Sequence, residues 1–149
     1  MERELLYKDL TDRVLKCFYD VYDTLGYGFL EKVYERAMLV RLQEDNLEVK
    51  NQLPIKVFFH DVNVGDYFAD IVVEEKLILE LKAEEKLDQR SDYQLLNYLK
   101  ATEMEVGLVL NFGRKPEFRR KIFTNDRKKM EDGTRTTRIG RITTDKIIK

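Results

Sequence analysis

The chain reads Asp70-Ile71-Val72-Val73 and, three residues later, Leu77-Ile78-Leu79-Glu80-Leu81-Lys82. These two apolar runs predict the strands of one β-hairpin with a loop over residues 74–76. Paired residues of a hairpin share a face, so pairing Val73 with Leu77 places Asp70 opposite Glu80. A two-residue loop would shift the pairing by one residue and break both faces. We therefore expect one apolar face and a second face that carries Asp70, Glu80 and Lys82.

The segments around this hairpin predict an α/β fold. Apolar residues at helical spacing indicate helices over residues 5–25, 30–45 and 89–102. Strands are expected over residues 47–51, 55–59, 64–73, 77–82 and 106–111, and residues 117–123 fit a last strand or a short helix. The wholly apolar run 106–111 is typical of a strand that is covered on both faces. This order predicts a mixed β-sheet with helices on its faces.

Composition limits the class of protein. The chain has 149 residues, of which 43% are hydrophobic and 37% charged, which suits one soluble domain with a real core. No apolar run approaches the roughly 20 residues that cross a bilayer, so we expect no membrane association. The single cysteine, Cys17, excludes an internal disulfide and a cysteine-rich zinc site. Residues 1–4 do not resemble a signal peptide, and we expect a cytoplasmic protein.

Charge is unevenly distributed along the chain. Residues 125–149 hold eight basic and four acidic side chains, whereas the whole chain has a net charge of -1, so residues 1–124 are acidic. We expect one folded domain over residues 1–124 and a basic, flexible tail over residues 125–149. The tail could be an arm that contacts nucleic acid or a solvated terminus. An acidic body means that any nucleic-acid surface on the domain must be local.

The charged face of the hairpin could hold a divalent metal ion. Asp70 and Glu80 would supply two carboxylates roughly 5 Å apart at Cβ, and Mg²⁺ prefers such oxygen ligands. A metal there could polarise a phosphate and activate water, and Lys82 could orient that water or offset charge on the phosphate. On these residues alone, a plain cluster of ion pairs on an exposed sheet face is an equal alternative.

Two pairs of helical residues could extend this site. Glu31 and Tyr34 lie three residues apart and share a helix face, as do Gln94 and Tyr98, four residues apart. Glu31 could reach the metal directly or through water, and the second pair could contact a nucleotide. Taken alone, Glu31 also fits an exposed first-turn acid favoured by the helix dipole, and Gln94 a polar edge beside a leucine stripe.

The full set of motifs resembles a known family. Gly28-Phe29-Leu30-Glu31-Lys32-Val33-Tyr34 matches the signature of the bacterial and archaeal GxxExxY proteins, which are placed in the PD-(D/E)XK nuclease superfamily. The resemblance spans residues 10–123 and includes Glu80-Leu81-Lys82 and Gln94-Leu95-Leu96-Asn97-Tyr98, the latter similar to the QxxxY motif of RecB-like nucleases. It implies a restriction-endonuclease-like, three-layer α/β/α core and cleavage of DNA or RNA that depends on Mg²⁺ or Mn²⁺.

The resemblance also implies roles for individual residues. Asp70, Glu80 and Glu31 would be metal ligands, and Lys82 would join them in catalysis. Substrate contacts are expected from Gln94, Tyr98, Tyr34 and Lys100. Ala69 stands where the superfamily name has proline.

The leading hypothesis is thus a small metal-dependent nuclease. One alternative is a non-catalytic module on the same fold that binds nucleic acid or protein, because the body is acidic and has no separate recognition domain. Another is a structural homodimer in which the charged sheet face is only an interface.

Overall fold

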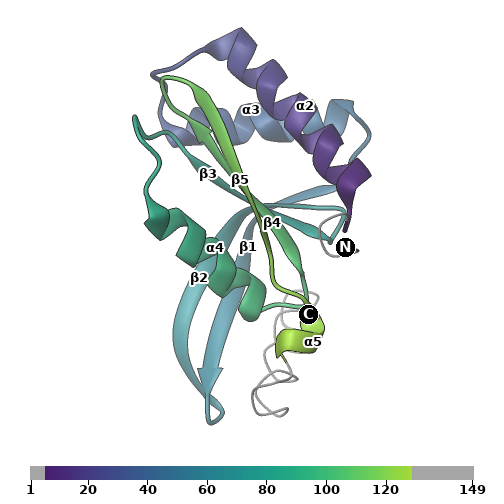
Figure 1. Ribbon diagram of the computed structural model, residues 1–149, viewed down its shortest axis with the longest axis vertical. Helices are drawn as coiled ribbons and strands as arrows, with labels where there is room; N and C mark the ends of the chain where they lie inside the picture. Colours follow the sequence, from purple (N-terminus) through teal and green to yellow (C-terminus); the bar gives the residue numbers. More distant parts are fainter. Residues whose placement is uncertain (1–5, 129–149) are drawn as a thin grey trace.

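The computed structural model describes residues 6–128 and shows a five-stranded β-sheet with helices on both faces (Figure 1). In chain order the elements are α2 (Lys8–Leu25), α3 (Glu31–Glu44), β1 (Val49–Phe59), β2 (Val62–Val73), β3 (Leu77–Lys82), α4 (Gln89–Lys100), β4 (Val106–Phe112), β5 (Pro116–Ile122) and α5 (Asn125–Lys128). Among these helices, none is long and apolar enough to span a membrane.

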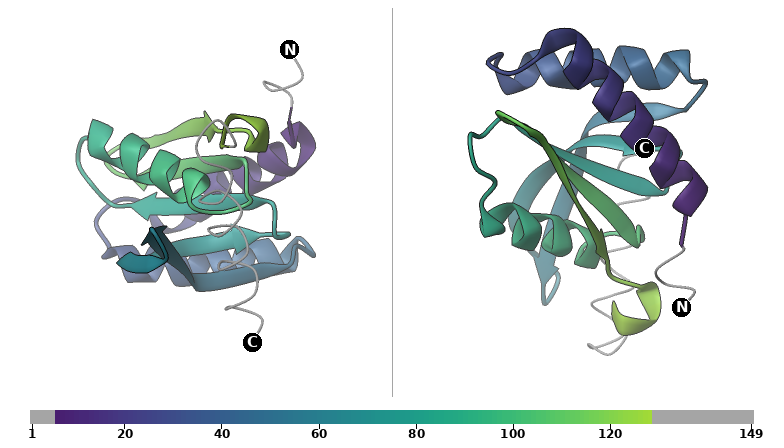
Figure 2. Two further views of the ribbon diagram at one scale, coloured as in Figure 1. Left: turned by 90° about the horizontal axis from the view of Figure 1, so that it is seen from below. Right: turned by 45° about the horizontal axis from the view of Figure 1, so that its top comes forward.

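The sheet is mixed and has the strand order β1-β2-β3-β4-β5. Strands β3 and β4 are parallel and joined by α4, whereas every other neighbouring pair is antiparallel. Helices α2 and α3 cover one face of the sheet and α4 covers the other, so the sheet is the middle of three layers (Figure 2). The expected restriction-endonuclease-like α/β/α architecture is confirmed.

The predicted hairpin register is also confirmed. Ile71 pairs with Leu79 and Val73 with Leu77, so the loop is residues 74–76. The five apolar residues expected on one face all join the core under α2 and α3: Ile71, Val73, Leu77, Leu79 and Leu81. Val72 and Ile78, on the other face, pack in a second core under α4. Helix α4 therefore covers the charged face at Val72 and Ile78, so this face is not open to solvent along its whole length.

One predicted boundary is wrong. Two strands were expected on either side of Pro54, but β1 runs without interruption from Val49 to Phe59. Pro54 pairs with Phe68 of β2, and β1 is an edge strand of the sheet. Proline lacks the N–H that a central strand would need, but an edge strand has one side without a partner strand. The element order is therefore two helices, three strands, α4, two strands and α5.

The far end of the β1–β2 hairpin extends beyond α4 (Figure 1). It closes at His60 and Asp61, which both have positive φ values of 49° and 68°. Two consecutive residues of this kind match a two-residue hairpin turn. The turn is thus shorter than the predicted residues 60–63, and β2 begins at Val62.

The last described residues continue past the expected domain boundary at residue 124. Asn125–Lys128 form α5, and the buried Lys128 donates hydrogen bonds from Nζ to the carbonyl oxygens of Thr102 (2.7 Å) and Met104 (2.8 Å). Residues 129–149 of the expected tail lie outside the described part of the chain. Of residues 117–123, for which a strand or a short helix is expected, 117–122 lie in β5, and Phe123 follows its end.

Candidate functional site

Asp70 and Glu80 lie side by side where the paired part of β2 and β3 ends. They are the next residues along each strand after the Ile71–Leu79 pair. The backbone N–H of Leu81 donates a hydrogen bond to Asp70 Oδ2 over 2.8 Å, which holds that carboxylate against β3. Glu80 is only 4% exposed, and its Oε1 has no hydrogen-bond partner among the described residues. Buried carboxylate oxygens nearly always have a partner, so this one marks an incomplete site.

The raised pKa values of Asp70 and Glu80 also indicate an incomplete site. Burial raises the pKa of Glu80 from 4.5 to about 8; the Asp70 carboxylate adds to this rise and the Lys82 ammonium group opposes it. Burial also raises the pKa of Asp70, against the lowering effect of the Leu81 N–H. Two carboxyl groups that share a site shielded from water favour the protonated form, because ionising both requires desolvation energy and brings two negative charges together. A positive charge bound there would reverse this preference.

Glu31 and Lys82 complete a group that we call the carboxylate cluster: Glu31, Asp70, Glu80 and Lys82. Glu31 is the first residue of α3 and Lys82 the last of β3. Partial burial raises the pKa of the Glu31 carboxyl group, Lys82 lowers it, and Asp70 raises it. The structure therefore brings the four residues expected at the catalytic site within electrostatic reach of one another.

Local structure explains how the segment from Gly26 to Tyr34 presents Glu31 to the sheet. Gly26 and Gly28 have φ values of 73° and 121°, a region that side chains with a Cβ rarely adopt. The Tyr34 hydroxyl donates a hydrogen bond to the Gly26 carbonyl (2.5 Å) and accepts one from the Phe29 N–H (3.2 Å). These two hydrogen bonds tie the turn over residues 26–29 to α3. Glu31, the first residue of α3, lies between Phe29 and Tyr34 in the chain.

Tyr34 does not lie where a substrate contact was expected. Its side chain is fully buried, and its ring stacks on Phe112 of β4 with centroids 4.2 Å apart. A ring with no exposed surface cannot meet a nucleic acid, so Tyr34 positions the α3 N-terminus instead. The helical spacing of apolar residues already predicts Tyr34 on the inner stripe of the helix over residues 30–45, and the burial of its side chain confirms that placement.

Two further polar residues of the site were missed by sequence reasoning. Glu35 is buried one turn after Glu31, and it accepts hydrogen bonds from Gln52 Nε2 (3.1 Å) and Lys32 Nζ (3.2 Å). Gln52 also acts on Asp70, whose pKa its side chain lowers, and its own backbone has a positive φ of 54°. The i, i+4 spacing of Glu31 and Glu35 was a usable signal, whereas Gln52 gave none before the β1–β2 pairing was known.

Asn111 holds the loop that follows Lys82. It pairs with Lys82 across β3 and β4, and its side chain bonds both the N–H (2.9 Å) and the carbonyl (2.8 Å) of Glu84. Gly113 lies against the same loop, since an added Cβ would stand 2.3 Å from the Glu84 carbonyl oxygen. This close packing fixes the chain direction immediately after the lysine of the cluster.

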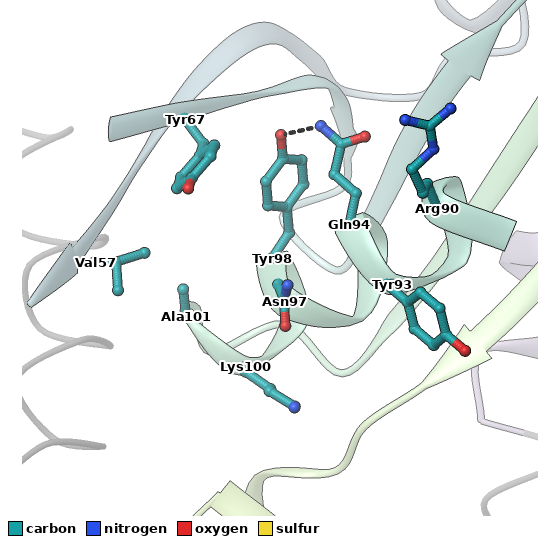
Figure 3. Close-up of a pocket in the computed structure, with 9 residues that line it drawn as sticks. All are labelled: Val57, Tyr67, Arg90, Tyr93, Gln94, Asn97, Tyr98, Lys100 and Ala101. Carbon is teal, nitrogen blue, oxygen red and sulfur yellow. Dashed lines mark hydrogen bonds between the residues drawn. The ribbon is translucent and has the colours of Figure 1, made fainter. Parts of the chain in front are cut away.

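Gln94 and Tyr98 lie on α4 and face the sheet from the opposite layer. Gln94 Nε2 donates a hydrogen bond to the Tyr98 hydroxyl over 2.8 Å, which is the dashed line in Figure 3. Burial raises the pKa of Tyr98 to about 12, and the Glu80 and Asp70 carboxylates contribute to that rise. Tyr98 is therefore a neighbour of the carboxylate cluster. Lys100 lies at the end of α4, exposed, with its Nζ 5.5 Å from the centroid of the Phe123 ring.

Whether the carboxylate cluster fits a metal ion depends on how closely its acidic side chains approach one another and on their chemistry. Within residues 6–128, no group of three or more His, Cys, Asp and Glu side chains is gathered closely enough to hold one. The chemistry of the cluster does fit a divalent cation, because Glu31, Asp70 and Glu80 offer the hard oxygen ligands that Mg²⁺ and Mn²⁺ prefer. The unpartnered, buried Oε1 of Glu80 is the clearest sign of such a fit.

Comparison with known proteins identifies the family. Residues 8–121 match the PD-(D/E)XK nuclease superfamily. The chain belongs to this superfamily. No curated protein and no solved structure matches the chain.

The name of the PD-(D/E)XK superfamily describes the residues at the end of this hairpin. Asp70 precedes Glu80-Leu81-Lys82 in the chain, and β2–β3 pairing brings the two parts of the motif together. Ala69, at the position of the proline, is fully buried and pairs with Leu53 of β1. Its side chain belongs to the core under α4, together with Leu53 and Val72.

Proposed function

We propose that this chain is a metal-dependent nuclease that hydrolyses phosphodiester bonds in DNA or RNA with Mg²⁺ or Mn²⁺ as its cofactor. The observation that carries the proposal is the pair of Asp70 and the buried Glu80, one of whose oxygens has no partner within residues 6–128, in a chain of the PD-(D/E)XK nuclease superfamily. We further propose that it is a GxxExxY protein, supported by the positive φ of Gly28 and by the hydrogen bonds of Tyr34 to Gly26 and Phe29, directly before Glu31.

The residues of the carboxylate cluster would divide the work. Asp70 and Glu80 would hold the divalent ion, with Glu31 as a third ligand directly or through water. When bound, the ion supplies charge that polarises the scissile phosphate and makes water easier to deprotonate. Lys82, at the end of β3, would orient the attacking water and offset negative charge on the phosphate. The water oxygen bonds to phosphorus, one P–O ester bond breaks, and the departing oxygen takes up a proton.

Glu35 and Gln52 would act on this chemistry indirectly. The Gln52 amide donates to Glu35 and interacts with Asp70, so it links the second acid of α3 to the first carboxylate of the hairpin. Asn111 fixes the loop after Lys82. These contacts restrict the rotamers of the cluster, which a catalytic site needs because small displacements of reacting groups reduce rates strongly.

The experiment incubates the purified chain with labelled single- and double-stranded DNA and RNA, with Mg²⁺ or Mn²⁺ or with EDTA. We expect cleavage only with metal, and a loss of about 10²-fold or more in Asp70→Asn, Glu80→Gln and Lys82→Met. Asp66→Asn is the matched control, because Asp66 lies on the same strand but is exposed and paired with Lys56 at 3.0 Å.

Two other results would contradict the proposal. Cleavage that persists in EDTA and in Asp70→Asn would place the activity elsewhere. Nucleic-acid binding without any cleavage, unchanged in Asp70→Asn and without metal, would favour the non-catalytic module on the same fold. Calorimetric titration with Mn²⁺ gives a readout independent of activity, and we expect heat of binding in the wild type but not in Glu80→Gln.

A cytoplasmic location and a homodimeric assembly are proposed together with this function. Sedimentation of the purified chain tests the second of these directly.

A further inference from the structure

A pocket of about 450 Å³ lies between α4 and the β1–β2 hairpin. We call it the α4 pocket; it is lined by Val57, Tyr67, Arg90, Tyr93, Gln94, Asn97, Tyr98, Lys100 and Ala101 (Figure 3). Two of these residues come from the β1–β2 hairpin and the others from α4 and the residue that follows it. The pocket is therefore formed between elements that meet only in the folded chain, and its size suits one nucleotide or a similar ligand.

Three of the nine residues that line this pocket are tyrosines: Tyr67, Tyr93 and Tyr98. Tyr67 is 47% exposed and Tyr93 61% exposed, so both present ring surface to an incoming ligand. Tyr98 is nearly buried and forms the inner wall, with its ring centroid 5.9 Å from that of Tyr67. That separation leaves no room for a ring between Tyr67 and Tyr98, so a planar ligand would stack on the outer faces of the exposed tyrosines.

The polar groups of the α4 pocket suit a nucleotide. Arg90 and Lys100 are exposed at its rim and carry positive charge, although Arg90 is also paired with Asp88 at 3.1 Å. Asn97 and Gln94 offer amide groups that can bond the edge of a base. Flat rings for stacking, amides for base edges and cations for phosphate are the groups that bind unpaired nucleotides.

The position of the pocket links it to the site of hydrolysis. Tyr98 belongs both to the pocket wall and to the core that contains Val72 and Ile78, which lie two residues from Asp70 and Glu80 on the same strands. When a nucleotide of a single nucleic-acid strand lies in the α4 pocket, the neighbouring phosphate of that strand would therefore lie towards the carboxylates of the cluster. Bases in a duplex are already stacked and paired, so their faces are not available to Tyr67 and Tyr93 without a cost of unstacking.

We propose that the α4 pocket binds an unpaired nucleotide beside the scissile phosphate, so that the chain acts on single strands rather than on intact duplexes. This inference rests on the proposed nuclease function, whose substrate class it narrows. It uses groups that DNA and RNA share, namely a base and a phosphate, and so it includes single strands of both.

Binding is measured separately from cleavage. Fluorescently labelled single strands of about 12 nucleotides, in DNA and RNA form, and the matched duplexes are titrated with the full chain in EDTA, with anisotropy as the readout. We expect the single strand to bind about tenfold or more tightly than the duplex. A stronger response from one of the two single strands identifies which nucleic acid the pocket prefers.

The variants Tyr93→Ala and Tyr67→Leu test the pocket itself. Each should weaken single-strand binding by about tenfold and leave duplex binding unchanged, because each removes one stacking surface. Tyr93 lies exposed on a helix, so its replacement should not disturb folding, and circular dichroism checks both variants. Tyr19→Ala is the control, since Tyr19 is a similarly exposed tyrosine on α2, in the opposite layer.

Several results would overturn the inference. These are equal affinity for single strand and duplex, unchanged single-strand binding in both tyrosine variants, or no binding to any strand. Failure of the proposed function has a different signature: single strands would bind through Tyr67 and Tyr93 but would stay uncut with Mg²⁺ or Mn²⁺. Cleavage of duplexes that is unaffected by the tyrosine variants would instead refute the α4 pocket and leave the nuclease intact.

Discussion

Glu80 is the residue on which most of the site's chemistry converges. It occupies a strand position with apolar neighbours on both sides in sequence, and it is buried with one oxygen unpartnered. A buried carboxyl group of this kind opposes folding when it is ionised. The buried Glu80 therefore lowers the folding stability of the chain, as residues of active sites commonly do.

This cost makes folding stability depend on pH in the absence of metal. The folded-state pKa of Glu80 is about 8, against 4.5 for an ordinary Glu, so the folded state keeps a proton that the unfolded state releases between these values. The contribution of Glu80 to stability is therefore fully present below about pH 4.5 and is lost as the pH rises to about 8. Asp70 and Glu31, whose pKa values are also raised, act in the same direction.

Thermal unfolding in EDTA between about pH 5 and about pH 8 checks this prediction. We expect Tm of the wild type to fall over this range, by an amount equivalent to a few kcal/mol. Glu80→Gln should show a clearly smaller fall, since the amide does not titrate. Equal slopes in the two proteins would show that Glu80 ionises freely in the fold.

At the scale of elements, the close packing of α4 on the sheet decides where the side chains of this helix lie relative to the β2–β3 hairpin. Gly107 lies on β4 and pairs with Ile78 of β3, directly beneath Leu95 of α4. A Cβ at this position would stand 2.6 Å from Leu95 Cδ1 and 3.1 Å from the Ile78 carbonyl oxygen. The absent side chain lets α4 approach the sheet, and this approach is what places Gln94 and Tyr98 beside the hairpin.

Gly107→Ala should therefore destabilise the chain by about 1–3 kcal/mol, because the added methyl group meets a buried side chain and backbone. Gly65→Ala is the matched control: its Cβ would meet only the ring of the exposed Tyr67, at 2.9 Å, which can move. Denaturant unfolding of the two variants measures the difference. A loss of stability as large in Gly65→Ala as in Gly107→Ala would contradict this account.

At the scale of the whole molecule, the distribution of charge decides how strongly nucleic-acid binding can depend on contacts with phosphates. The chain carries 27 basic and 28 acidic residues, and the proposed site itself is acidic. The positively charged side chains that the structure places at the site and at the α4 pocket are few, namely Lys82, Arg90 and Lys100. Nucleic-acid binding should thus depend more on stacking and bound metal than on a broad basic surface.

The salt dependence of binding follows from this count. Three phosphate contacts on a single strand predict a slope of roughly -2 for log affinity against log salt. Titrations at several salt concentrations measure the slope for the full chain and for a chain that ends at Lys128. A much steeper slope that disappears in the shortened chain would mean that residues 129–149 bind phosphates as a basic arm.

The amino-acid sequence by itself determined the β2–β3 hairpin and its register. Alternation of apolar residues over Ile71–Val73 and Leu77–Leu81 is a local pattern, and it allows only one pairing that keeps both faces consistent. The same pairing brought Asp70 beside Glu80, and helical spacing brought Gln94 beside Tyr98. Such features depend on residues near one another in the chain, so a periodic pattern can reveal them.

Only the tertiary structure decided what covers each face. It carried β1 through Pro54 at the sheet edge, and it joined Gln52 and Glu35 to the carboxylate cluster. It also formed the α4 pocket from residues of the hairpin and of α4. A periodic pattern shows which residues share a face, but the element that packs on that face is chosen by long-range contacts, which no local pattern contains.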